Sequence, residues 1–302
     1  MPWLLGNPVA MQVIAFLAHA LFPAVVFAIG TTLTFREVGR ELRRGGLLLR
    51  TLVVACVLIP LATAAVVKFL HVPLLLGGVM LIASVAPGDP FDLVEAKGKK
   101  GNLALASVLF PVLVLVMPFT VPVWLGLFSR WFPLHLTVSP RALFLEIAPY
   151  TLLPLVLGLA CREWIPAGAR VLARAAEMFA RVAIVVLLAA FLWPALSTLA
   201  KFDAAAFTAI FLAVSFSLWA GYRAGGQDRR DGISVGVTAA LGNLAAIVLV
   251  THACYPGVHV WNTALAYVIV RWVVFKGWYL FLRRRMASTP VTPSSRASPR
   301  SS

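Results

Sequence analysis

Long runs of hydrophobic residues, separated by short polar stretches, cover almost the whole chain. A transmembrane helix needs about 20 largely apolar residues, and the spacing of these runs predicts nine spans. They lie near 9–34, 47–69, 73–95, 103–128, 142–161, 176–200, 204–222, 232–254 and 258–282. The pattern therefore predicts an all-α polytopic membrane protein with one transmembrane domain, 1–286. The Ser/Pro/Arg-rich segment 287–302 has nothing to bury and predicts a disordered tail.

Two of these spans, 73–95 and 232–254, contain residues that interrupt a helix. The interrupting residues are Pro87, Gly88, Asp89 and Pro90 in the first, and Gly236, Gly242 and Asn243 in the second. Broken spans at corresponding positions of two halves are typical of inverted-repeat transporters. Since the broken spans are five apart, we expect two inverted five-helix repeats whose broken helices cross, the first repeat lacking its first helix.

Composition and charge agree with a membrane protein and argue against nucleic acid. Hydrophobic residues make up 61% of the chain, against about 45–50% in soluble domains. The net charge of +15 comes largely from arginines in short runs between apolar segments, not from one basic surface. These runs follow alternate spans, which places the N-terminus outside and the C-terminus in the cytoplasm of a cell (inner) membrane. The three cysteines are far apart and indicate neither a disulfide framework nor a metal site.

Three stretches of the chain resemble the bile acid:sodium symporter family. They are FAIGTTLTFREV at 27–38, APGDP at 86–90 with GNLALASVL at 101–109, and GNLAAIVLVTHACYP at 242–256. The likeness covers most of the chain, in the right order and spacing. It implies a panel domain and a core domain, with two broken helices crossing in the core and an organic-anion site between the domains.

The chain departs from this family where sodium-using members carry oxygen ligands. Hydroxyl, asparagine, glutamate and glutamine positions of those members fall here on Asp89, Pro90, Asp92, Leu93, Ala106, Phe110, Gly236, Ala240 and Leu241. Sodium needs several hard oxygen ligands, so the resemblance predicts a carrier that does not use sodium. Its coupling ion would be a proton, or it would use none. The alternative is a sodium site rebuilt from backbone carbonyls.

Asp89 and Asp92 admit two interpretations. In the first, Asp89 is an N-cap, Pro90 is the first helical residue and Asp92 lies in the first turn, an ordinary start for the second half of a broken helix. In the second, either carboxyl group carries a coupling proton, because a carboxylate at membrane depth is costly unless it is paired. The nearby charges at Glu95 and 97–100 read as a solvated run at the membrane surface.

Four other polar residues are candidates for the substrate or coupling-ion site. Arg271 lies about 18 Å below the cytoplasmic end of the last span, and we expect it to pair with Asp89 or Asp92 or to capture a substrate anion. Thr238 and Asn243 flank the second break, where they would satisfy freed backbone groups or touch ligand. His19 could relay protons or bind substrate, or it could contact a neighbouring backbone.

The sequence thus predicts a secondary transporter of a small or amphipathic organic anion that works by alternating access. Its partners would be the organic solute, the lipid bilayer and, if coupled, a proton. The alternative is a non-transporting receptor or sensor on the same fold, favoured by the loss of the ion ligands. An enzyme is not expected, because no second intramembrane aspartate lies outside this loop and H-E-x-x-H does not occur; the G-x-S-x-G match at 232–236 (GISVG) lies within a predicted span. No cofactor is expected.

Overall fold

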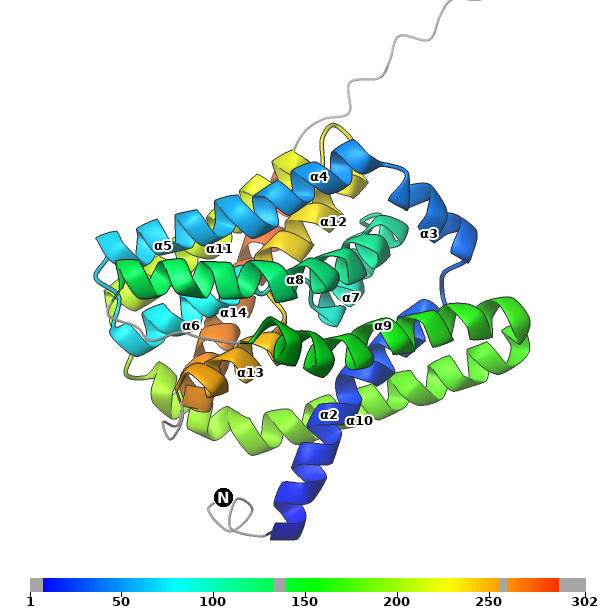
Figure 1. The fold of residues 1–302 in the computed structure, drawn as a ribbon, viewed down its shortest axis with the longest axis horizontal. Coiled ribbons are helices and arrows are strands. Elements are labelled where there is room, and N and C mark those ends of the chain that lie inside the picture. The colour runs from blue at the N-terminus through cyan, green and yellow to red at the C-terminus, as the bar shows by residue number, and fades with distance from the viewer. Residues whose placement is uncertain (1–7, 133–138, 256–259, 288–302) are drawn as a thin grey trace, which may run out of the picture.

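A computed structural model describes residues 8–132, 139–255 and 260–287, and these residues form helices joined by short turns, with no strand among them (Figure 1). The tail predicted at 287–302 lies outside the described residues beyond Ala287. In chain order the helices are α2 (Pro8–Gly30), α3 (Phe35–Leu42), α4 (Gly45–Val53), the π-helical η1 (Val54–Leu58), α5 (Ile59–Phe69), α6 (Leu74–Val85), α7 (Pro90–Gly98), α8 (Leu103–Trp131), α9 (Pro140–Trp164), α10 (Pro166–Leu199), α11 (Ala204–Ala224), α12 (Arg229–Ala240), α13 (Leu244–Cys254) and α14 (Val260–Ala287).

Several of these helices are long and apolar enough to cross a membrane. Within the described residues, three qualify by length and hydropathy: Gly45–Phe69, Leu103–Trp131 and Ala204–Ala224. Two bent pairs raise the number to five, one of them joining His19–Gly30 to Phe35–Leu42 across a 93° bend. The chain is therefore a multi-pass membrane protein, and the count of nine spans stays a prediction.

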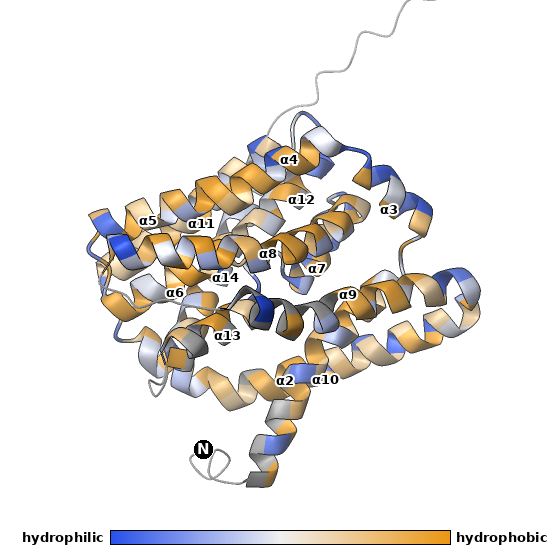
Figure 2. Cartoon of the chain, in the orientation of Figure 1, coloured by the Kyte–Doolittle hydropathy of each residue, from blue (hydrophilic) through white to orange (hydrophobic). Residues whose placement is uncertain are grey.

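Large apolar side chains cover the outside of the helices, as lipid contact requires. Phe119 and Trp193 are each 73% exposed, and hydrophobic residues run along most helices in Figure 2. Hydrophilic residues gather instead at α3, at the turn between α9 and α10, and at other helix ends (Figure 2). Exposed apolar surface of this extent indicates a nonaqueous partner, which here is the bilayer.

The helices pack in two groups. Helices α2, α9 and α10 contact one another and form what we call the three-helix group, below the other helices in Figure 1. Gly30 and Gly158 let α2 and α9 approach closely, since a Cβ on Gly30 would lie 2.6 Å from the carbonyl oxygen of Leu155. Helices α4 to α8 and α11 to α14, with η1, form the crossing group, which meets the three-helix group mainly where α8 contacts α9 and α14 contacts α10, and less extensively where α7 contacts α2.

Both interrupted spans are broken, as the sequence predicted, but one glycine plays a different part. The first break separates α6 from α7 at 86–89, and the second separates α12 from α13 at 241–243. Gly236 was predicted to belong to the second break, yet it lies inside α12. A Cβ on Gly236 would lie 3.3 Å from the carbonyl oxygen of Leu218, so this glycine serves close packing of α12 on α11.

Candidate functional site: the crossing of two broken helices

The two breaks lie against each other. Pro87 and Gly242 form an isolated antiparallel bridge, and the backbone N–H of Asn243 donates to the carbonyl of Ala86 at 2.6 Å. Only glycine fits at position 242, because an added Cβ would lie 2.7 Å from the carbonyl oxygen of Ala83. These contacts satisfy backbone groups that the breaks free, which membrane depth requires.

Asp89 caps two helices at once. Its backbone is extended at φ −109°, and one carboxylate oxygen accepts the N–H of Phe91 at 2.8 Å, as an N-cap of α7. The other oxygen accepts the N–H of Leu244, the first residue of α13, at 2.7 Å. A single buried carboxylate therefore faces the positive ends of both helix dipoles, and Asp89 is only 3% exposed.

Asp92 completes the cap but keeps one oxygen without a partner. Its Oδ2 atom accepts the N–H of Asp89 at 3.0 Å, which makes a capping box with Pro90 at the first helical position. Its Oδ1 atom is buried and has no hydrogen-bond partner. An unpartnered oxygen is costly on a buried charged carboxylate.

Asn243 and Gly88 tie the second break to the first. The Asn243 side chain accepts the N–H of Ala246 at 3.0 Å as the N-cap of α13, and its amide donates to the carbonyl of Gly88 at 2.8 Å. Gly88 has φ +85°, a backbone conformation that favours glycine. Of the two roles expected for Asn243, satisfying freed backbone groups is the one observed.

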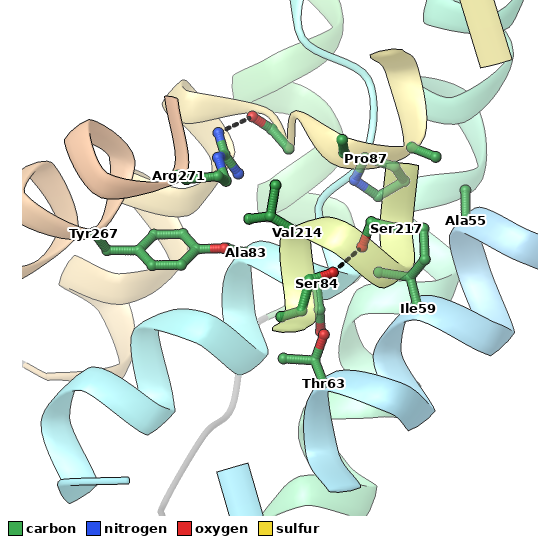
Figure 3. Close-up of a pocket in the computed structure, with 14 residues that line it drawn as sticks. Ala55, Ile59, Thr63, Ala83, Ser84, Pro87, Val214, Ser217, Tyr267 and Arg271 are labelled. Atoms are coloured by element: carbon green, nitrogen blue, oxygen red, sulfur yellow. Dashed lines mark hydrogen bonds between the residues drawn. The ribbon is translucent and has the colours of Figure 1, made fainter. Parts of the chain in front are cut away.

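Arg271 reaches the crossing from α14 but does not form the predicted ion pair. Its guanidinium donates to the carbonyl of Gly242 at 3.1 Å, the bond dashed in Figure 3. Among the described residues no carboxylate lies within 4.0 Å of it, and the oxygens of Asp89 accept backbone N–H groups instead. The cation lies instead at the C-terminal end of α12, the negative end of that helix dipole.

The remaining two predicted site residues are placed differently from each other. Thr238 lies in the last turn of α12, is 1% exposed, and its hydroxyl has no hydrogen-bond partner. His19 lies on α2 in the three-helix group, is exposed, and its ring is 6.3 Å from that of Tyr150. The structure therefore brings Thr238 to the crossing and leaves His19 outside it.

A buried charge cluster beside the crossing was misread in the sequence. Glu95 was expected in a solvated run, but it is 8% exposed and forms ion pairs with Lys99 and, at 2.7 Å, with Lys276 of α14. The Lys99 ammonium also lies 4.3 Å from the centre of the Phe275 ring. The four-residue spacing of Glu95 and Lys99 was the available signal for a helical ion pair.

A second polar cluster, at the predicted cytoplasmic end of the crossing group, joins the starts of α4, α8 and α12. Asp231 pairs with Arg44 and accepts the side-chain amide of Asn102 at 2.8 Å. Burial alone would raise the pKa of Asp231, but hydrogen bonds from Arg44 and Asn102 outweigh it and hold that pKa below its usual range. Hydrogen bonds to Asp231 and Glu41 raise the pKa of Arg44.

Two comparisons show which known proteins this chain resembles. The family model described as the sodium bile acid symporter family matches residues 19–202. A weaker similarity, 26% identity over 136 residues, links the chain to an uncharacterized sodium-dependent transporter, YocS, of Bacillus subtilis (strain 168). That alignment covers 45% of this chain and 41% of the length of the relative.

Proposed function

The chain belongs to the sodium bile acid symporter family, and from that premise we propose that it is a secondary carrier of a small or amphipathic organic anion. The observation that carries the proposal is the antiparallel contact of Pro87 with Gly242, where two broken helices meet inside a bundle. Broken helices that meet in this way form the substrate and ion sites of inverted-repeat transporters. The proposal includes nine spans, arranged as two inverted five-helix repeats of which the first lacks its first helix, and a single transmembrane domain over 1–286.

Alternating access would come from movement of the crossing group against the three-helix group. The organic anion would bind between the groups, beside the crossing, where α2 meets α7. Phe22 and Phe91 face each other there, with ring centres 6.1 Å apart. Aromatic and aliphatic walls of this kind suit an amphipathic solute.

The charges at the crossing support a carrier that does not use sodium. In transporters with broken helices, helix C-termini and unwound carbonyls coordinate the coupling cation. Here the Arg271 guanidinium donates to the Gly242 carbonyl at the C-terminal end of α12. The arginine side chain, a cation tethered to the protein, therefore occupies the position that a mobile coupling cation would take. Asp92, with its unpartnered oxygen, is the group we propose for a coupling proton, because protonation removes the cost of a buried charge.

Sodium coupling is the second candidate, and the name of the Bacillus relative favours it, since YocS is called a sodium-dependent transporter. In that case backbone carbonyls freed at 86–89 and 241–243, together with the Thr238 hydroxyl, would supply the ligands.

The proposed orientation has the N-terminus outside and the C-terminus in the cytoplasm of a cell (inner) membrane. It rests on the alternation of basic residues between spans. The polar cluster of Arg44, Asn102 and Asp231 would then lie at the cytoplasmic face.

Uptake into proteoliposomes tests the proposal. The purified full chain would be reconstituted with a labelled bile acid or a labelled short-chain carboxylate outside, and a proton or a sodium gradient would be imposed separately. We expect flux that follows the proton gradient, or needs no gradient, and that is unchanged by sodium. Flux driven only by sodium would select the second candidate, and binding without any flux would select a receptor.

Two aspartate variants sharpen this experiment. Asp92→Asn keeps the shape of the side chain but cannot carry a proton, so we expect it to lose the response to the proton gradient. Asp203→Asn is the matched control, because Asp203 is the exposed N-cap of α11, far from the crossing in the chain. If both variants respond like the parent protein, Asp92 is not the coupling group.

A further inference from the structure

A small cavity lies inside the crossing group, and none of the described side chains of α2, α9 or α10 lines it. Its walls come from η1, α5, α6, α11, α12 and α14, with Pro87 and Gly242 of the two breaks (Figure 3). The volume is about 20 Å³, enough for a particle the size of a water molecule and too small for an organic solute. The cavity is therefore separate from the place where we propose that the organic anion binds.

Three of the polar residues that line this cavity carry a hydrogen-bond donor without an acceptor. The Nε–H of Arg271 has no acceptor although the residue is only 3% exposed. The hydroxyls of Thr63 and Tyr267, which are 4% and 5% exposed as residues, make no hydrogen bond within the described part of the chain. Figure 3 shows the Tyr267 ring extending from α14 toward the other lining residues, and the Arg271 guanidinium at its bond to the Gly242 carbonyl. Buried donors in such numbers require an explanation.

Two further hydroxyls can adapt to a ligand. Ser84 and Ser217 line the cavity and donate to backbone carbonyls of Leu81 and Ala213 at 2.7 and 2.8 Å. A hydroxyl rotates about its C–O bond and can turn its proton toward a ligand. None of the described lining residues is acidic, and one is an arginine. The lining therefore carries positive charge and no competing carboxylate.

We propose that this cavity is a binding site for a small inorganic anion of halide size. The Arg271 guanidinium would supply the charge and its Nε–H, and the Thr63 and Tyr267 hydroxyls would donate the remaining hydrogen bonds. Hydrogen bonds to a charged partner are about twice as strong as neutral ones. A bound cation is disfavoured, because the guanidinium is fixed at the wall.

The site goes beyond the proposed transport function and is tested without it. The purified full chain would be melted in detergent in sodium chloride, sodium bromide or sodium gluconate of equal ionic strength. A ligand that binds the native state raises the melting temperature with its concentration. We expect a saturable rise with chloride and bromide over gluconate, because gluconate is too large for the cavity.

A matched pair of threonine variants separates this site from a general salt effect. Thr63→Val keeps the side-chain shape and removes one donor, so we expect the apparent Kd for chloride to rise about tenfold. Thr51→Val is the control, since Thr51 is 1% exposed on α4, bonds only the Leu47 carbonyl and lies outside the cavity lining. Arg271→Gln should abolish the halide effect.

Two outcomes would overturn the proposal. Equal melting temperatures in chloride and gluconate would mean that the cavity holds water only. A halide effect of the same size in Thr63→Val, Thr51→Val and the parent protein would place the anion elsewhere. These readings stand if Arg271→Gln fails to fold, and they do not depend on whether the protein transports an organic anion.

Discussion

The carboxylate of Asp89 accepts the backbone N–H of Leu244, 155 positions later in the chain, at 2.7 Å. The same carboxylate caps its own helix through Phe91. One acidic side chain thus joins the start of α7 to the start of α13. This double cap explains why an apolar chain has an aspartate between two prolines. The crossing of the two broken helices depends on these two hydrogen bonds.

Loss of the two hydrogen bonds that Asp89 accepts should destabilise the protein strongly. Asp89→Ala leaves the N–H groups of Phe91 and Leu244 buried without acceptors, and each such group costs about 1–3 kcal/mol. We expect a large fall in melting temperature in detergent. Asp203→Ala, which removes a single exposed cap from α11, should cause a much smaller fall. Equal effects of the two variants would show that the Asp89 bond to Leu244 contributes nothing beyond an ordinary cap.

A methyl group at Gly242 should separate the broken helices. An added Cβ would lie 2.7 Å from the Ala83 carbonyl oxygen and 3.1 Å from that of Ala86, so Gly242→Ala must move one break away from the other. We expect a lower melting temperature and loss of uptake. Gly126→Ala is the control in an open position of α8, where replacing glycine stabilises a helix by up to about 1 kcal/mol. A neutral Gly242→Ala would contradict the close contact.

Removal of the tethered cation should create a response to sodium. In Arg271→Gln the Gly242 carbonyl and the C-terminal end of α12 lose their positive partner, and a mobile cation can replace it. We expect the melting temperature of this variant, but not of the parent protein, to rise when N-methylglucamine gluconate is exchanged for sodium gluconate. A sodium response already present in the parent protein would favour the second candidate function.

Removing one charge from the buried cluster of Glu95, Lys99 and Lys276 should destabilise the protein more than removing two opposite charges together. Glu95→Gln leaves Lys99 buried without a counter-charge, a kind of change that costs about 3–5 kcal/mol. The double variant Glu95→Leu, Lys99→Met removes both buried charges and should recover much of that loss. Melting temperatures of the single and double variants decide this, and a double variant no more stable than Glu95→Gln would refute it.

The pairing of Asp231 with Arg44 should make stability depend on pH in the acid range. Because the folded-state pKa of Asp231 is lowered, its stabilising effect is complete above the unfolded pKa, about 3.9, and is lost as pH falls through the lower folded value. The difference in melting temperature between the parent protein and Asp231→Asn should thus stay constant from pH 8 to about 5 and shrink below about 4. A difference in melting temperature that grows as the pH falls would contradict this prediction.

The sequence could predict local features, because these depend on residues that lie close together in the chain. The two breaks, the cap at Asp89 and the place of Asp92 in the first turn follow from the order Gly88, Asp89, Pro90 and from the spacing of the acids. The all-helical class followed from the length of the apolar runs. Each of these depends on local backbone preference or on hydropathy, which a single sequence contains.

Contacts between distant segments could not be read in the same way. The sequence identified Arg271 as a candidate but not its partner, since the choice between a carboxylate and the Gly242 carbonyl depends on how α14 packs. Gly236 was assigned to the break because helix-breaking and close-packing glycines look alike in sequence. Glu95 was assigned to solvent because burial by Phe275 and Lys276 comes from a helix about 180 residues away.

The most direct test of the account is counterflow in proteoliposomes that contain no sodium. Vesicles loaded with an unlabelled organic anion would be diluted into a trace of the same labelled anion, with N-methylglucamine as the cation on both sides. A carrier with a tethered cation at its crossing predicts transient accumulation of label, abolished by Gly242→Ala and retained in Gly126→Ala. Accumulation that occurs only when sodium is added would contradict the account.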